Sequence, residues 1–188
     1  YQGKQLFTVY GHLQQVLVPR GQHVSTGDLL GLTGETGRGT GPHLHMEIRL
    51  GARTFFSTLN PELWLVPPQG WGVLAARFYR SNGKEMQGEL IEITSVYTGQ
   101  IWYARTYTKG AINKDAYYQE NFVVSDLPAG LYQVELSYIG KLYSQTIDIY
   151  PGRVSFLSFY GQDGFNLDPP VAPGEDFNPF EAEDEGPS

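Results

Sequence analysis

The sequence predicts an all-β protein. Aromatic residues are abundant, with 13 Tyr, 10 Phe and 3 Trp among 188 residues, whereas charged residues make up only 18%. Apolar and β-branched residues recur in short alternating runs, and turns rich in the 23 glycines and 12 prolines separate these runs. Alternation with a period of two is typical of half-buried strands, and this punctuation favours many short strands over long helices.

The first third of the chain predicts short strands joined by turns. A turn over residues 1–5 should precede the first strand, and GETGRGTGP at residues 34–42 holds too many glycines for a regular element. NPELWL at residues 60–65 predicts one helical turn, with Asn60 as the N-cap and Pro61 in the first helical position. The strands that we expect cover residues 5–13, 16–18, 29–33 and 43–50.

The rest of the chain predicts a second domain. We expect a first domain over residues 1–66, a linker over 67–72, a seven-stranded β-sandwich over 73–160 and an acidic tail over 161–188. The seven strands should cover residues 73–80, 88–96, 100–107, 121–124, 131–138, 141–149 and 153–159. SNGKEMQG and SYIGKLYS are expected to form hairpin turns between them.

The net charge of −7 is unevenly distributed. Residues 161–188 hold eight acidic residues and no basic one, whereas residues 1–160 hold 12 acidic and 13 basic residues. The tail is too polar to fold alone, although Phe165, Phe177 and Phe180 could dock on a partner or on the rest of the chain. No basic stripe predicts nucleic-acid binding, no apolar run predicts a transmembrane segment, and the absence of cysteine excludes disulfides.

Three of the four histidines form a candidate site. His43 and His45 are two residues apart on a predicted strand, so both side chains should lie on one face. Two imidazoles placed in this way can share a metal ion, or one can bind metal while the other moves a proton. His12 lies on another predicted strand, and strand pairing could bring it into the same groove. His23, between two glycines, is interpreted as an ordinary loop histidine.

Each of these residues also has a simpler interpretation. A His-x-His pair occurs often by chance. Glu47 either orients a histidine, as carboxylates behind metal ligands do, or is an ordinary strand carboxylate. Tyr10 either lines the groove or fills the sheet.

The order of several short motifs resembles a known family. YGHL at residues 10–13 is followed by Gly-rich turns, by GTGPHLHME at 39–47 and by Asn60-Pro61. This pattern resembles the M23 zinc metallopeptidases, the lysostaphin-like or LytM-type enzymes that cut peptide cross-links in bacterial peptidoglycan. The resemblance implies a lysostaphin-like antiparallel sheet, with His45 as a Zn²⁺ ligand and with His43 and His12 as catalytic histidines. It implies an extracellular or cell-envelope location.

The resemblance also indicates an incomplete metal site. The family takes its other two zinc ligands from an upstream H-x-x-x-D segment, and this chain contains no H-x-x-x-D. We therefore expect the C-terminal part of a peptidase domain only. The chain is then a fragment, or a partner chain or second copy completes the N-terminal sheet. Alternatively, it is a non-catalytic envelope or structural protein built on a degenerate peptidase fold.

The second domain resembles a different class of module. DLPAGLY at residues 126–132 resembles a turn of carboxypeptidase-regulatory-like or transthyretin-like sandwiches, which are usually spacers or adhesive modules. Pro128 and Gly130 should form a tight turn, after which Tyr132 points inward. The aromatic residues of IWYARTYTKG, with Tyr117 and Tyr118, are interpreted as core or cross-strand pairs, or else as a surface for glycan or protein.

Overall fold

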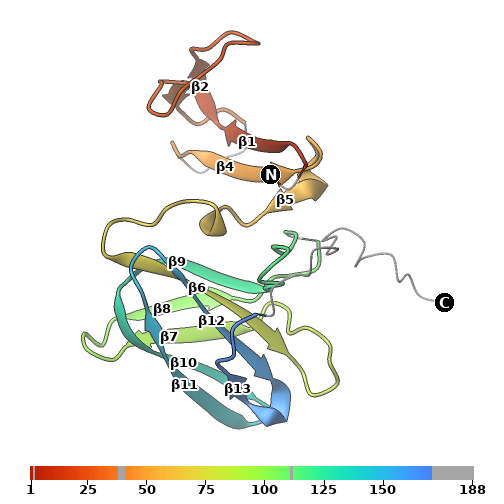
Figure 1. Cartoon of the computed structure of the whole chain (residues 1–188), viewed down its shortest axis with the longest axis vertical. Helices are drawn as coiled ribbons and strands as arrows, with labels where there is room; N and C mark the ends of the chain where they lie inside the picture. The colour runs from red at the N-terminus through yellow and green to blue at the C-terminus, as the bar shows by residue number, and fades with distance from the viewer. Residues whose placement is uncertain (2, 38–40, 111, 171–188) are drawn as a thin grey trace, which may run out of the picture. The chain divides into compact units, whose positions relative to one another are not determined.

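The chain divides into two compact units in the computed structural model, which describes residues 1, 3–37, 41–110 and 112–170 (Figure 1). Unit 1 is Tyr1–Pro61 and unit 2 is Glu62–Ser188. Strands and three short 3-10 turns are the regular elements of the described residues, so the all-β prediction is confirmed. None of the helical turns in this part of the chain is long or apolar enough to cross a membrane.

Unit 1 contains a three-stranded antiparallel sheet and a separate hairpin. The sheet has the order β1-β4-β5, with β1 at one edge, and pairs Leu6 with Leu50 and Gly11 with His45. The hairpin pairs β2 with β3. The strands are β1 (Leu6–Gly11), β2 (Leu13–Val16), β3 (Gly31–Thr33), β4 (His45–Leu50) and β5 (Thr58–Leu59), and the 3-10 turn is η1 (Phe55–Ser57). A second 3-10 turn, η2 (Pro61–Leu63), spans the division between the two units.

The predicted strand over residues 5–13 is wrong in one respect, because it is interrupted at His12. His12 has φ 56°, in the left-handed region, and this ends β1 and starts β2 at Leu13. The predicted turn before β1 is present, since the Lys4 backbone N–H donates to the Tyr1 carbonyl at 2.9 Å. The predicted helical turn is found as η2. Residues 38–40 of the predicted irregular segment lie outside the described residues.

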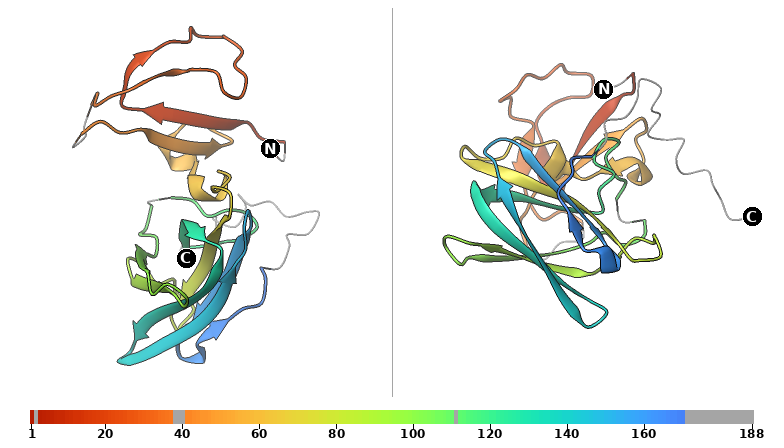
Figure 2. Two further views of the ribbon diagram at one scale, coloured as in Figure 1. Left: turned by 90° about the vertical axis from the view of Figure 1, so that its left-hand side faces the viewer. Right: turned by 60° about the horizontal axis from the view of Figure 1, so that its bottom comes forward.

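Unit 2 consists of two four-stranded sheets that share one core (Figure 2). One sheet has the order β11-β10-β7-β8, and the other has the order β13-β12-β6-β9. All pairs are antiparallel except β6 with β12, which run parallel. The elements are β6 (Trp71–Tyr79), β7 (Leu90–Ser95), β8 (Ile101–Arg105), β9 (Phe122–Pro128), β10 (Gly130–Tyr138), β11 (Lys141–Ile149), β12 (Val154–Tyr160), η3 (Gly161–Asp163) and β13 (Phe165–Asn166).

Aromatic and aliphatic side chains from both sheets form the core of unit 2. Phe78 of β6 is fully buried, and its ring lies 5.3 Å from that of Phe122 and 6.2 Å from that of Phe159. The core extends across to Ile91 and Val134 of the facing sheet, both fully buried. All seven predicted strands of this region are present. Burial alternates along strands such as β7 and β10, whereas β6 and β12 are nearly continuous buried runs.

The boundaries of unit 2 differ from the prediction at both ends. The division between the units follows Pro61 rather than residue 66, and β6 begins at Trp71, inside the predicted linker. Residues 161–166, predicted as tail, form η3 and β13 instead. Phe165 packs on the core with its ring 5.1 Å from Phe159, as its apolar character allowed. Phe177 and Phe180 lie outside the described residues.

Two predicted turns of unit 2 are confirmed in detail. Ile139 and Gly140 join β10 to β11 with φ values of 48° and 72°, as a tight hairpin requires. Tyr132 points inward, and its hydroxyl donates to the Pro128 carbonyl at 2.7 Å, which ties the start of β10 to the preceding turn. Of the aromatic segment, Trp102 packs on Tyr132 at 5.5 Å, whereas Tyr103 is exposed.

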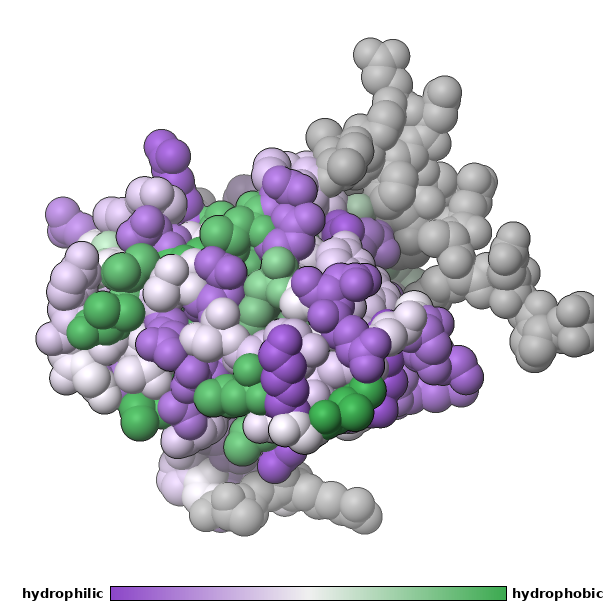
Figure 3. Space-filling model, turned by 90° about the horizontal axis from the view of Figure 1, so that it is seen from below, coloured by the Kyte–Doolittle hydropathy of each residue, from purple (hydrophilic) through white to green (hydrophobic). Residues whose placement is uncertain are grey.

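The surface of the molecule seen in Figure 3 carries apolar side chains in several separate groups, with polar residues between them. Such scattered apolar residues are normal on the surface of a folded domain. The core described above explains part of the aromatic content of the sequence, since both sheets contribute rings to it, and other aromatic side chains, such as Tyr97 and Tyr103, are exposed.

The side chain of Asn121, the residue before β9, is hydrogen-bonded to the backbone of β6, and its removal tests how much these buried hydrogen bonds stabilise unit 2. The buried side chain accepts from the Phe78 N–H at 2.8 Å and donates to the Phe78 carbonyl at 2.9 Å. Asn121→Ala should lower the free energy of unfolding by about 1–3 kcal/mol, because it leaves the buried Phe78 N–H without its acceptor, whereas the Phe78 carbonyl still accepts from the Met86 N–H. Chemical denaturation measures this loss. The matched control is Asn82→Ala, at an exposed turn residue, and an equal loss there would contradict the explanation.

Candidate functional site

Three histidines of unit 1 lie together. The rings of His12 and His43 are 4.6 Å apart between centroids, and those of His12 and His45 are 5.7 Å apart. His45 begins β4, His43 precedes it and forms an isolated bridge to Gly34, and His12 stands at the break between β1 and β2. The predicted convergence of these three side chains is therefore present in the structure.

Two glycines make room for this arrangement. Gly11 pairs with His45, and a Cβ atom on Gly11 would lie 3.1 Å from the His45 Cβ. Gly34 bridges to His43, and a Cβ atom there would lie 2.8 Å from the backbone nitrogen of Gln14. A side chain at Gly34 would force the backbone to move, so the chain can approach this closely only with glycine at that position.

The hydrogen bonds of the three rings fix which nitrogen carries the proton. His12 Nδ1 lies 2.6 Å from the Thr36 carbonyl, and His43 Nδ1 lies 2.7 Å from the Gly41 carbonyl. His45 Nε2 lies 2.8 Å from a carboxylate oxygen of Glu47. All three acceptors lack hydrogen, so each of these nitrogens is the donor. The lone pairs are consequently on Nε2 of His12 and His43 and on Nδ1 of His45.

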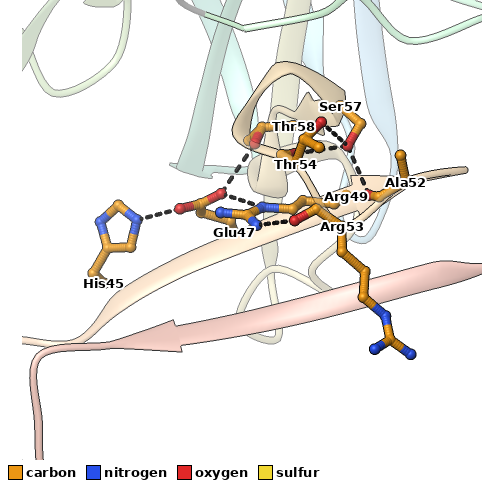
Figure 4. A network of polar contacts seen from close by, with 8 residues as sticks. All are labelled: His45, Glu47, Arg49, Ala52, Arg53, Thr54, Ser57 and Thr58. Carbon is orange, nitrogen blue, oxygen red and sulfur yellow. Dashed lines mark hydrogen bonds and ion pairs between the residues drawn. The ribbon is translucent and has the colours of Figure 1, made fainter.

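Glu47 links His45 to a polar network on β4 and β5 (Figure 4). One carboxylate oxygen accepts from His45, and the other accepts from Arg49 Nε at 2.7 Å and from the Thr58 hydroxyl at 3.0 Å. Arg49 also donates to the Arg53 carbonyl at 2.7 Å. The Glu47 side chain is only 9% exposed, whereas that of His45 is 46% exposed. The buried Glu47 carboxylate thus holds the solvent-accessible imidazole of His45 in place.

The Glu47 carboxylate is ionised over most of the pH range. Its hydrogen bond from Arg49 lowers its pKa to about 2, with smaller contributions from His45 and Thr58, and these outweigh the effect of burial. An ionised carboxylate can only accept hydrogen bonds. It is therefore suited to accept the Nε2–H of His45 over most of the pH range.

The other candidate residues fall outside this cluster. His23 is exposed in the loop between β2 and β3, as expected of a loop histidine. Tyr10 pairs with Met46, so it lies on the face of the sheet opposite His45, and this favours the sheet-filling interpretation. The sequence reasoning missed Arg49 and Thr58. The two-residue spacing of His43, His45, Glu47 and Arg49 was a signal that could have found Arg49.

The donor atoms of the cluster suit zinc in kind but not in number. Neutral imidazole nitrogen is a common zinc ligand, and a catalytic zinc ion takes three protein ligands. No group of three or more His, Asp or Glu residues placed to hold a metal is present among residues 1, 3–37, 41–110 and 112–170.

Comparison with known proteins supports the resemblance seen in the motifs. Residues 1–56 match the model of Peptidase family M23. The M23 match includes all three clustered histidines. The chain is also similar to the peptidoglycan DD-endopeptidase ShyA of Vibrio cholerae, with 51% identity over 51 residues, and to ShyB of the same organism, with 54% identity over 41 residues. An uncharacterized metalloprotease of Haemophilus influenzae is 39% identical over 74 residues.

These similarities cover a small part of each protein. The matched segments are 27%, 22% and 39% of this chain, and they are 12%, 10% and 15% of ShyA, ShyB and the H. influenzae protein. The chain thus matches less than a sixth of the length of these curated relatives.

Proposed function

We propose that unit 1 is part of an M23-type, zinc-dependent endopeptidase that hydrolyses peptide cross-links of peptidoglycan. The observation that carries this proposal is the cluster of His12, His43 and His45, in which each ring has one nitrogen held by an acceptor and one with a lone pair. The M23 match to residues 1–56 and the names of the V. cholerae relatives support the choice of reaction and substrate.

The residues of the cluster have distinct tasks in this proposal. Bound zinc would polarise the scissile carbonyl and lower the pKa of a water molecule. His45 offers Nδ1 as a ligand. His12 and His43 offer Nε2 lone pairs, which can accept the proton of the attacking water and return it, as Nε2–H, to the leaving amine. The protonated ring can also donate a hydrogen bond to the developing oxyanion.

The remaining parts of the proposal concern the environment of the enzyme. We propose that the other zinc ligands lie outside the described cluster, in an H-x-x-x-D segment or in a partner chain. We also propose a cell-envelope or extracellular location, because peptidoglycan lies there. Unit 2 is assigned the role of an accessory module.

Zinc content and cleavage together test this function. The protein expressed from its complete gene should bind about one zinc per chain and release new amino termini from cross-linked peptidoglycan fragments. Purified residues 1–188, measured in parallel, should show whether this chain alone retains the metal. Absence of both zinc and cleavage in the complete protein would overturn the proposal and favour the non-catalytic structural protein.

A further inference from the structure

We propose that Arg49 and Glu47 act as a positioning pair that selects the tautomer of His45. In this arrangement Arg49 fixes the orientation of the Glu47 carboxylate, and the carboxylate holds the proton of His45 on Nε2. The lone pair of the neutral His45 ring is then on Nδ1. The catalytic meaning of this device rests on the proposed function, whereas the tautomer is a property of the chain itself.

The two oxygens of Glu47 have different partners. One accepts from His45 Nε2 at 2.8 Å, and the other accepts from Arg49 Nε at 2.7 Å and from the Thr58 hydroxyl at 3.0 Å. All three partners donate. The group at position 47 must therefore accept on both sides, and a carboxylate is the side chain that does so.

Arg49 is held firmly enough to impose this orientation. Its side chain is only 16% exposed, it bonds Glu47 through Nε, and it bonds the Arg53 carbonyl through a second nitrogen at 2.7 Å. Guanidinium is a donor at every pH that the protein experiences. The oxygen of residue 47 that faces Arg49 and Thr58 must accordingly remain an acceptor, whatever lies on the other side.

Glu47→Gln should reverse the tautomer of His45. The glutamine oxygen should face Arg49 and Thr58, which leaves its NH₂ group facing His45. Two donors cannot bond each other, so His45 should turn Nε2 into an acceptor and carry its proton on Nδ1. An amide in place of the orienting carboxylate reverses the imidazole tautomer of serine-protease triads in the same way. The lone pair of His45 would then be on Nε2, facing residue 47, and Nδ1 would no longer offer a lone pair to a metal ion.

Nitrogen NMR of the histidine side chains in residues 1–188 tests the proposal without metal or substrate. Wild-type protein should show the proton of His45 on Nε2, and Glu47→Gln should show it on Nδ1. Glu47→Asp keeps a carboxylate and should restore the Nε2–H form at least in part, whereas the exposed Glu35→Gln should leave the spectrum of His45 unchanged. A wild-type proton on Nδ1, or an unchanged tautomer in Glu47→Gln with the backbone spectrum intact, would overturn the proposal.

Activity separates this inference from the proposed function. If the complete protein cleaves peptidoglycan peptides, Glu47→Gln should lower kcat/KM by about 10–100-fold, as loss of partners behind metal ligands does, and Glu47→Asp should recover part of it. If the tautomer reverses in Glu47→Gln but no form of the protein cleaves the substrate, the positioning pair stands and the peptidase assignment fails.

Discussion

Replacing His43 with alanine is expected to lower peptide hydrolysis by the complete protein by about 10²–10⁴-fold, the usual contribution of a general acid–base group. His43 holds its Nδ1 proton against the Gly41 carbonyl and offers Nε2 to the cluster, with its ring 4.6 Å from that of His12. In this position it can carry a proton without being the metal-bound ring. Zinc content should therefore stay unchanged in His43→Ala.

Steady-state cleavage of a cross-linked peptide and metal analysis measure both effects. His45→Ala should lose zinc and cleavage together, since the lone pair on Nδ1 of His45 is the one proposed to bind the metal. His23→Ala is the matched control, because this fourth histidine is exposed in the loop between β2 and β3. Cleavage by His43→Ala at the wild-type rate would refute the assignment of His43.

The stability of unit 2 is expected to fall as pH rises from about 4.5 to about 7. Glu120 has no exposed surface, and its burial raises its pKa to about 7. Within this window the folded protein keeps a proton that the unfolded chain has lost, so unfolding becomes easier as pH increases. A pKa displacement of this size corresponds to about 3 kcal/mol of unfolding free energy. Below pH 4.5 both states are protonated and the effect vanishes.

Glu120→Gln should remove most of this pH dependence. The amide can accept from the Asp115 backbone N–H, which lies 2.9 Å from Glu120, and can bond the Tyr107 hydroxyl at 3.2 Å, without ever ionising. Denaturant unfolding at pH 4, 5.5 and 7.5 compares the two proteins, with the exposed Glu89→Gln as control. A small slope should remain, because burial also raises the pKa of Glu62. Identical slopes in wild type and Glu120→Gln would contradict this account.

The seven longer strands of unit 2 could be predicted from sequence because each is a run of at least five residues, either alternating, as in β7, or continuously apolar, as in β6. β5 and β13 could not, since two-residue strands have no period to detect. The break in the first strand escaped prediction for another reason. His12 adopts φ 56°, and histidine gives no local signal for this conformation of the kind that glycine gives. The parallel pairing of β6 with β12 depends on partners far apart in sequence.

The histidines of the candidate site could be predicted from the sequence, but the hydrogen bonds that hold their rings could not. The spacing of His43 and His45 placed both rings on one face, and the resemblance placed His12 beside them. The tautomers depend on backbone acceptors such as the Thr36 and Gly41 carbonyls. Every residue has a backbone carbonyl, so the sequence does not indicate which ones accept from the histidines. The sequence left Glu47 open between two interpretations, and its hydrogen bond to His45 favours the orienting one.

The alternation of β4 has a consequence for how this segment can change over evolution. His45, Glu47 and Arg49 occupy one face, and the intervening residues, including the buried Ile48 and Leu50, occupy the other. Substitutions can therefore alter the apolar face while sparing the polar one. Insertion or deletion of a single residue would exchange the two faces at once. Lineages of such a protein should therefore vary on the apolar face of this stretch, and keep both its polar residues and its length constant.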